Sequence, residues 1–170
     1  MAATALLIID VQNELFRKKT PVYRADEMLA NICTLAECAR QAGAPAIYVQ
    51  HENNTMSKDS DGWQLHPHLR PHEGDLFFHK QQSSALKVNA LQDALASLGI
   101  RQLVITGLVT HGCVKAACLD GIKLGYQVTL VSDGHSNFNA NPVECIGETH
   151  EKLRQAGVSL KTTAEVTFAS

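Results

Sequence analysis

The feature that most constrains the fold is an alternation of short apolar runs with stretches of helical periodicity. The run Thr4–Asp10 is almost continuously apolar and ends in an acid, a pattern typical of a strand buried on both faces of a sheet. The stretch Ala25–Ala42 repeats its apolar side chains at helical spacing and stops at Gly43, a residue suited to follow a helix C-terminus. The pattern continues, with strands expected at Pro45–His51, Leu76–Lys80, Gln102–Leu108, Gln127–Asp133 and Val158–Val166, and helices at Val88–Leu98, Gly112–Leu124 and Pro142–Ala156.

This rhythm predicts a single α/β domain over residues 1–170. We expect a three-layer αβα sandwich around a six-stranded, mostly parallel, doubly wound sheet. A chain of 170 residues that is 45% hydrophobic can bury a full core as one domain. The one long irregular stretch, Glu52–Asp75, is of a length that in a compact domain usually serves a function.

Charge and composition exclude several classes of protein. The chain has 15 basic and 17 acidic side chains and a formal net charge of −2, so it lacks the basic footprint of nucleic-acid binding. Its longest apolar run, Ala5–Ile9, is too short to cross a bilayer, and the N-terminal region lacks the features of a signal peptide. No glycine-rich phosphate loop follows Asp10, which disfavours nucleotide cofactors. We expect a soluble cytoplasmic protein that needs no cofactor and binds neither nucleic acid nor membranes.

Three reactive side chains stand at or just beyond the ends of predicted strands. Asp10 ends the first strand, Lys80 ends the third, and Cys113 follows the fourth. Because ligands bind beyond the carboxyl ends of parallel strands, we expect the three side chains to meet in one pocket. Cys113 is also expected at the start of a helix, where the helix dipole and a nearby ammonium favour a thiolate near neutral pH. Asp10 can then shuttle a proton, which gives a nucleophile, an activator and an acid/base.

The same segments resemble the isochorismatase-like cysteine hydrolase superfamily, to which nicotinamidases, N-carbamoylsarcosine amidases and isochorismatases belong. The resemblance covers nearly the whole chain. It rests on three segments in order: Asp10-Val-Gln-Asn-Glu-Leu-Phe16, Lys80 followed by Ser84-Ala85, and Thr106-Gly-Leu-Val-Thr-His-Gly-Cys-Val114.

The resemblance implies a catalytic triad in which Cys113 is the nucleophile and Asp10 and Lys80 complete the site. It also implies a cis peptide between Leu108 and Val109, with the amides of Val109 and Cys113 forming an oxyanion hole. Such donors stabilise a tetrahedral oxyanion by a few kcal/mol each. By the same resemblance we expect a homo-oligomer, a dimer or larger.

The sequence departs from the pattern of the superfamily at several positions. His111 stands where many members carry an acid, and Leu86 replaces a phenylalanine. Nicotinamidases carry an Asp-x-His metal pair where this chain reads His51-Glu52-Asn53-Asn54, so nicotinamide is not indicated as the substrate. His66, His68 and His72 cluster in the long loop, but the solvated interpretation is favoured there, and no metal is expected.

The substrate pocket is expected to include Phe16, His51 and Trp63, although both aromatic residues also suit ordinary packing. The favoured function is metal-independent hydrolysis of a small amide or ureido C–N bond through a cysteine thioester. One alternative is an isochorismatase-type hydrolase that cleaves a vinyl ether, which needs no thiol nucleophile. Another is a non-catalytic binding protein for a small molecule on the same fold.

Overall fold

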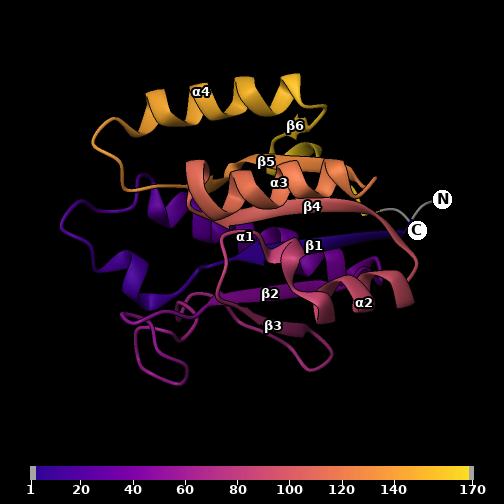
Figure 1. Cartoon of the computed structure of the whole chain (residues 1–170), viewed down its shortest axis with the longest axis horizontal. Coiled ribbons are helices and arrows are strands. Elements are labelled where there is room, and N and C mark those ends of the chain that lie inside the picture. Colours follow the sequence, from indigo (N-terminus) through magenta and orange to yellow (C-terminus); the bar gives the residue numbers. More distant parts are fainter. Residues whose placement is uncertain (1–2, 169–170) are drawn as a thin grey trace.

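The computed structural model describes residues 3–168 and contains one six-stranded sheet in which every strand pair is parallel. The strands lie in the order β3-β2-β1-β4-β5-β6 (Figure 1). Their bounds are β1 (Ala3–Ile9), β2 (Ala46–His51), β3 (Leu76–Lys80), β4 (Ile100–Leu108), β5 (Gln127–Ser136) and β6 (Ser159–Lys161). The order reverses on either side of β1, which is the arrangement of a doubly wound sheet.

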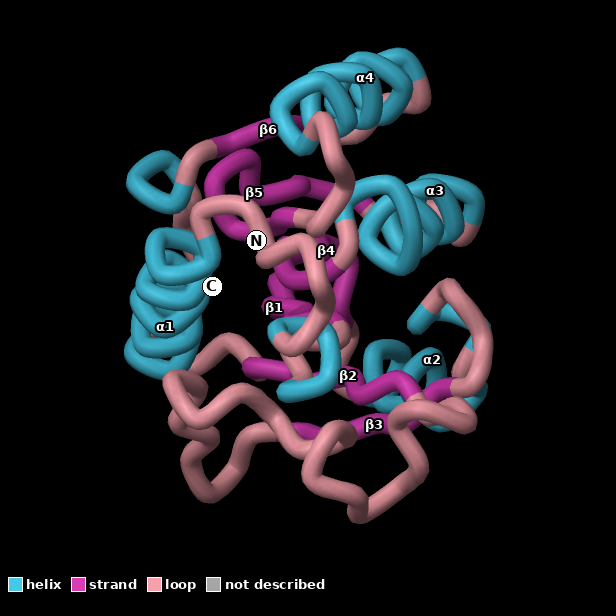
Figure 2. The backbone as a smooth tube through the Cα atoms, turned by 90° about the vertical axis from the view of Figure 1, so that its left-hand side faces the viewer, coloured by secondary structure: helices cyan, strands magenta, loops and turns pink. Residues whose placement is uncertain are grey.

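Helices cover both faces of this sheet, as Figure 2 shows in an end-on view. Helix α1 (Ala25–Gln41) covers one face. Helices α2 (Asn89–Ser97), α3 (Lys115–Lys123) and α4 (Pro142–Gln155) cover the other. Two hydrophobic layers fill the spaces between sheet and helices, and β1 supplies alternate residues to each, since Leu7 faces one layer and Leu6 the other. The predicted αβα sandwich is therefore confirmed.

Three predicted elements differ from the observed ones by three residues or more. Strand β5 continues to Ser136, three residues beyond its predicted end. The last strand is only three residues long, and a short helical turn, Thr163–Glu165, follows it. Thr162 caps this turn because its hydroxyl and amide both bind the Glu165 carboxylate. Helix α3 begins at Lys115 rather than Gly112, because Gly112 has φ −112° and ψ −112°, which no helix allows. Cys113 thus lies in the turn Thr110–Val114, before the helix.

The long loop is tied to the sheet at the edge where the strands end (Figure 1). The buried Gln12 amide accepts a hydrogen bond from the backbone N–H of His51 and donates to the backbone carbonyls of His51 and Trp63, at 2.8, 3.0 and 2.9 Å. At the other end of the loop, Arg40 of α1 forms a salt bridge of 2.7 Å with Asp75. In the described part of the chain, no helix has the length and apolarity needed to cross a membrane.

Candidate active site

Asp10, Lys80 and Cys113 meet in a polar cluster at the carboxyl edge of the sheet. The ammonium nitrogen of Lys80 lies 3.0 Å from Asp10 Oδ2 and 3.2 Å from Cys113 Sγ. Asp10 and Lys80 are buried, with 3% of each residue exposed. The convergence predicted from the strand ends is therefore what the fold produces, because β1, β3 and β4 all end at this edge.

Lys80 has more hydrogen-bond partners than hydrogens. Besides Asp10 and Cys113, its nitrogen contacts His51 Nδ1 at 2.9 Å and the carbonyl of Gln82 at 3.1 Å. An ammonium carries three N–H bonds. Lys80 therefore cannot donate a separate hydrogen bond to each of its four acceptors. A charged Lys80 also requires His51 Nδ1 to be unprotonated. Burial and the Lys80 charge both lower the pKa of His51, which agrees with a neutral imidazole.

Asp10 is held at the end of β1 in a left-handed backbone conformation, with φ 53°, which Asp tolerates better than most residues. Its amide still donates to the Val49 carbonyl of β2 at 2.9 Å. One carboxylate oxygen binds Lys80, whereas the other, Oδ1, is buried and has no hydrogen-bond partner among residues 3–168. Burial raises the pKa of Asp10 above its ordinary value, although Lys80 acts in the opposite direction. A buried acceptor with a raised pKa is suited to take up a proton.

Cys113 is a thiol rather than a thiolate in this environment. Burial, followed by the charge of Asp10, raises its pKa to about 11, and Lys80 offsets only part of this. The expectation of a thiolate near neutral pH is therefore wrong. The expectation overlooked two effects. The thiol is more buried than a position at a helix start implies, and the carboxylate of Asp10 beside it opposes a second negative charge.

The turn that carries Cys113 begins at a cis peptide between Leu108 and Val109, which confirms this prediction. Gly107, just before it, has φ 116°, and a Cβ atom at this position would lie 2.0 Å from the carbonyl oxygen of Ile9. Only glycine lets β4 pass so close to the end of β1. This close approach brings the Thr110–Val114 turn beside Asp10.

The three expected pocket residues are placed differently. His51 joins the polar cluster through Lys80. Trp63 packs edge-on against His79, with ring centroids 4.9 Å apart, and its buried Nε1 has no partner in the described chain. Phe16 packs against His66 at 4.5 Å. The structure thus brings His51 to the cluster, while the aromatic contacts of Phe16 and Trp63 are with loop and strand histidines.

Several residues at the site were not found from the sequence. Gln12 fixes the backbone of both His51 and Trp63, and the Gln82 carbonyl binds Lys80. Thr110 is fully buried and bonded to His135 and Asn137. A buried amide between two apolar segments is a weak signal for Gln12. Contacts made through backbone carbonyls leave no sequence signal.

One group of three side chains in residues 3–168 is close enough to hold a metal ion. Ligand atoms of Asp10, His51 and Cys113 lie within 4.8 Å of one another. Lys80 Nζ already contacts all three at 3.2 Å or less, so a metal ion would have to displace a buried ammonium. This donor set therefore does not fit a resident metal while Lys80 is charged. Of the loop histidines, His66 and His68 pack edge to face, with ring centroids 5.0 Å apart.

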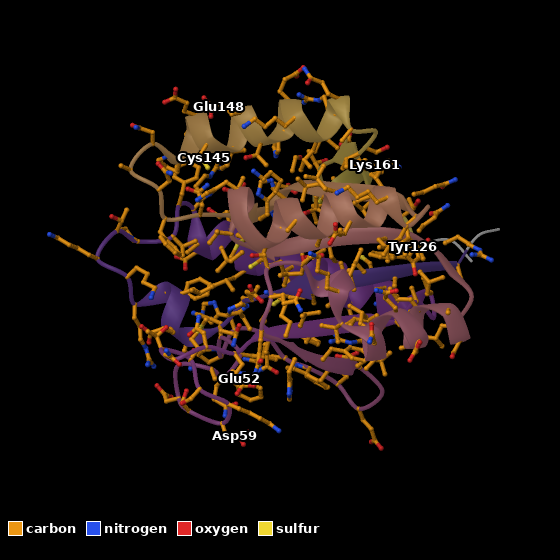
Figure 3. All side chains as sticks on the ribbon, viewed as in Figure 1. Glu52, Asp59, Tyr126, Cys145, Glu148 and Lys161 are labelled. Carbon is orange, nitrogen blue, oxygen red and sulfur yellow. The ribbon has the colours of Figure 1, made fainter. Side chains whose placement is uncertain are left out.

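A cavity of about 360 Å³ borders the cluster at Lys80. Charged and amide side chains dominate its lining, and Val88 is the one aliphatic residue among Glu52, His79, Lys80, Gln81, Gln82, Ser84, Lys87 and Val88. Figure 3 shows Glu52 at the edge of the molecule where the long loop begins. The cavity thus offers hydrogen-bonding groups beside Lys80, although neither Asp10 nor Cys113 lines it.

Comparison with known proteins gives consistent matches along the chain. The model of the isochorismatase domain matches residues 4–165. Streptothricin hydrolase from Streptomyces noursei is 27% identical over 148 residues, covering 85% of this chain and 59% of that protein. Ureidoacrylate amidohydrolase from Pseudomonas syringae pv. syringae is 30% identical over 169 residues, covering 76% of this chain and 69% of that protein. A crystal structure of an isochorismatase family protein superimposes with a TM-score of 0.89 at 26% identity, covering 94% of this chain and 98% of the other.

Fold and sequence together define an isochorismatase-like hydrolase. The chain belongs to the isochorismatase family, and its relatives include amidohydrolases. It spans less than two thirds of the length of streptothricin hydrolase.

Proposed function

We propose that this protein hydrolyses a small polar amide or ureido compound through a thioester on Cys113. One observation carries the proposal. A thiol, a carboxylate and an ammonium converge within 3.2 Å contacts in a buried cluster, and one carboxylate oxygen has no partner in the described chain. A general base beside a protonated nucleophile is an arrangement that activates a weak nucleophile.

The first half of the reaction transfers an acyl group to sulfur. Cys113 Sγ attacks the carbonyl carbon while Asp10 accepts the thiol proton, which is required because the pKa of Cys113 is raised to about 11. The oxyanion of the tetrahedral intermediate binds the amides of Val109 and Cys113. Asp10 then gives its proton to the nitrogen as the C–N bond breaks, so ammonia or an amine leaves and the thioester remains.

The second half regenerates the enzyme. Asp10, again a carboxylate, takes a proton from water as the water oxygen attacks the thioester carbonyl. The C–S bond breaks, the acid product leaves, and the proton returns to Cys113. Throughout, the Lys80 ammonium stays beside both Asp10 and Sγ, where it stabilises whichever of the two is negative.

The surroundings support a small polar substrate. The cavity at Lys80 carries Glu52 and Lys87 on its walls, and amide or ureido groups both donate and accept hydrogen bonds. The relative named ureidoacrylate amidohydrolase acts, by its name, on a ureido compound, which agrees with this class.

The test is a panel of primary amides, ureido acids and a vinyl ether, with release of ammonia or of the cleaved product measured for the wild type, Cys113→Ala and Cys38→Ala. Cys38 is an exposed cysteine on α1 and serves as the matched control. We expect hydrolysis of at least one amide or ureido compound that Cys113→Ala abolishes and Cys38→Ala retains. Cleavage of only the vinyl ether, or hydrolysis that survives Cys113→Ala, would overturn the proposal, as would a wild type inactive on the whole panel.

A further inference from the structure

A second polar network lies behind the turn that carries Cys113. Asn137 Nδ2 is 3.2 Å from Thr110 Oγ1, which is 2.8 Å from His135 Nδ1. His135 Nε2 in turn lies 2.7 Å from His150 Nε2. Asn137 and Thr110 are fully buried and His135 is 4% exposed, whereas His150, on α4, is half-buried. The network therefore runs from the turn, through β5, to the helix that covers it.

The direction of each hydrogen bond follows from the groups at one end. The Asn137 side-chain oxygen accepts from the backbone N–H of Asn139 at 2.9 Å, so its NH₂ group must face Thr110. Thr110 Oγ1 accepts that bond, and within residues 3–168 the acceptor for its own hydrogen is His135 Nδ1. His135 must then carry its hydrogen on Nε2 and donate to His150 Nε2. Each of the three hydrogen bonds then has one donor and one acceptor.

Both imidazoles are neutral in this arrangement, which suits their surroundings. Burial and His150 lower the pKa of His135 to about 3. Burial, together with the charge of Arg154, lowers the pKa of His150. Hydrogen bonds that link neutral groups, three of them buried, hold those groups in one geometry.

The network is attached to the candidate active site through Thr110. Thr110 follows the cis peptide by one residue and precedes Cys113 by three. His135 pairs with Gly107 across β4 and β5, so it also lies beside the start of the turn. A separate contact, 3.2 Å between His111 Nδ1 and Cys145 Sγ, joins the same turn to α4, and Figure 3 shows Cys145 on that helix.

We propose that His135 and His150 are positioning residues, which hold the Thr110–Val114 turn so that Cys113 stays against Lys80. His150 acts as the terminal acceptor that fixes the tautomer of His135, and His135 then fixes the hydroxyl of Thr110. This inference deepens the proposed function and takes its catalytic meaning from it, although the hydrogen bonds themselves exist independently of any substrate.

A spectroscopic experiment tests the network directly in the full-length wild-type protein. With ¹⁵N-labelled histidine, we expect a ¹⁵N–¹⁵N coupling across the hydrogen bond between His135 and His150, with Nε2 of His135 protonated and Nε2 of His150 not. Absence of the coupling, or a protonated His150 Nε2 at pH 7, would overturn the assignment. Neither outcome depends on the identity of the substrate.

A second experiment tests the positioning role. The probe is iodoacetamide at pH 9, and mass spectrometry follows alkylation of Cys113 relative to the exposed Cys38 in the same sample. His150→Leu should slow alkylation of Cys113 about fivefold, because Sγ drifts from the ammonium that stabilises its thiolate. His150→Gln supplies a new acceptor at the same reach and should restore most of the rate. His72→Leu, at an exposed loop histidine, should match the wild type.

Equal alkylation rates in His150→Leu and wild type would overturn the positioning role, as would failure of His150→Gln to recover the rate while its fold stays intact by circular dichroism. Failure of the proposed function looks different. In that case the wild type hydrolyses no compound of the panel, while the coupling and the alkylation rates remain as expected.

Discussion

At the scale of single residues, the chemistry depends on how the three N–H bonds of Lys80 are shared. Asp10, His51 and Gln82 offer oxygen or nitrogen acceptors at 2.9 to 3.1 Å, and Cys113 offers sulfur at 3.2 Å. Sulfur is the weaker acceptor while it is protonated, so the resting cluster satisfies Lys80 without it. Once the thiol loses its proton, the same ammonium is already in contact with the thiolate.

Asp10→Asn should separate thiol activation from proton transfer. The Asp10 charge raises the pKa of Cys113, so its removal lowers that pKa and increases alkylation at pH 8 by about tenfold for each unit of change. Hydrolysis should nevertheless be lost, because no group remains to move the proton. Ammonia release and iodoacetamide labelling measure the two effects. Asp59→Asn, in the exposed loop (Figure 3), is the control, and hydrolysis at the wild-type rate by Asp10→Asn would remove Asp10 from the mechanism.

Lys80→Met should act in the opposite direction on the thiol. Lys80 lowers the pKa of Cys113, and methionine keeps most of the volume without the charge. The pKa of Cys113 therefore rises further in this variant. The rate of Cys113 alkylation at pH 9 falls by about tenfold for each unit by which that pKa rises. The pH profile of alkylation should shift to higher pH, whereas that of the exposed-loop variant Lys58→Met should not. An unchanged profile in Lys80→Met would mean that Lys80 does not stabilise the thiolate.

At the scale of elements, the site depends on how closely β4 approaches β1. Glycine at position 107 removes the side chain that would strike the carbonyl of Ile9. The end of β4 thus lies beside Asp10, and the turn that follows carries Cys113 into contact with Lys80.

Gly107→Ala should destabilise the protein severely. The new Cβ would meet the backbone of Ile9 at 2.0 Å in a left-handed conformation, at a cost of about 3 kcal/mol or more in the free energy of unfolding. Gly147→Ala is the matched control, since no atom lies within 4 Å of its Cβ in the middle of α4. That variant should gain up to about 1 kcal/mol. Urea unfolding measures both, and equal stability of the two variants would contradict this account.

Elements could be predicted from the sequence more completely than the site. Strand and helix periods fixed the order and type of every major element, because burial on one or two faces leaves a repeating pattern. β6 is shorter than expected because Thr162 and Glu165 form a cap that competes with the strand.

Asp10, Lys80 and Cys113 were found because they stand at strand ends. Gln12, Thr110 and the two network histidines were missed, since hydrogen bonds between distant segments leave no periodic signal. The pKa of Cys113 was misjudged because its depth of burial cannot be read from spacing.

At the scale of the whole molecule, the loop between β2 and β3 behaves as part of the sheet edge. Gln12 binds the backbone of the loop near its start and at Trp63, an antiparallel bridge joins Gln12 to Leu65, and Arg40 holds Asp75 at its end. The loop is therefore fixed at four points, three of them by Gln12, which follows Asp10 by two residues, and the fourth by Arg40 of α1.

Gln12→Leu should release this loop. The carbonyl and the N–H of His51 lose their Gln12 partner, and the Trp63 carbonyl keeps only the Gln50 amide, which favours local opening by about 1–3 kcal/mol. Trypsin cleavage after the exposed Lys58 should become about tenfold faster or more. Gln64→Leu changes an exposed side chain of the same loop and should leave cleavage unchanged. Equal cleavage rates in both variants would show that Gln12 does not hold the loop.

The most direct test of the central claim is the mass of the enzyme during turnover. With the best amide or ureido compound of the panel in excess, the reaction is quenched in acid and the intact protein and its peptides are weighed. We expect an adduct of the acyl group on the peptide that carries Cys113, absent in Cys113→Ala and lost on treatment with hydroxylamine. Turnover without any such adduct, at a rate that Cys113→Ala preserves, would contradict it.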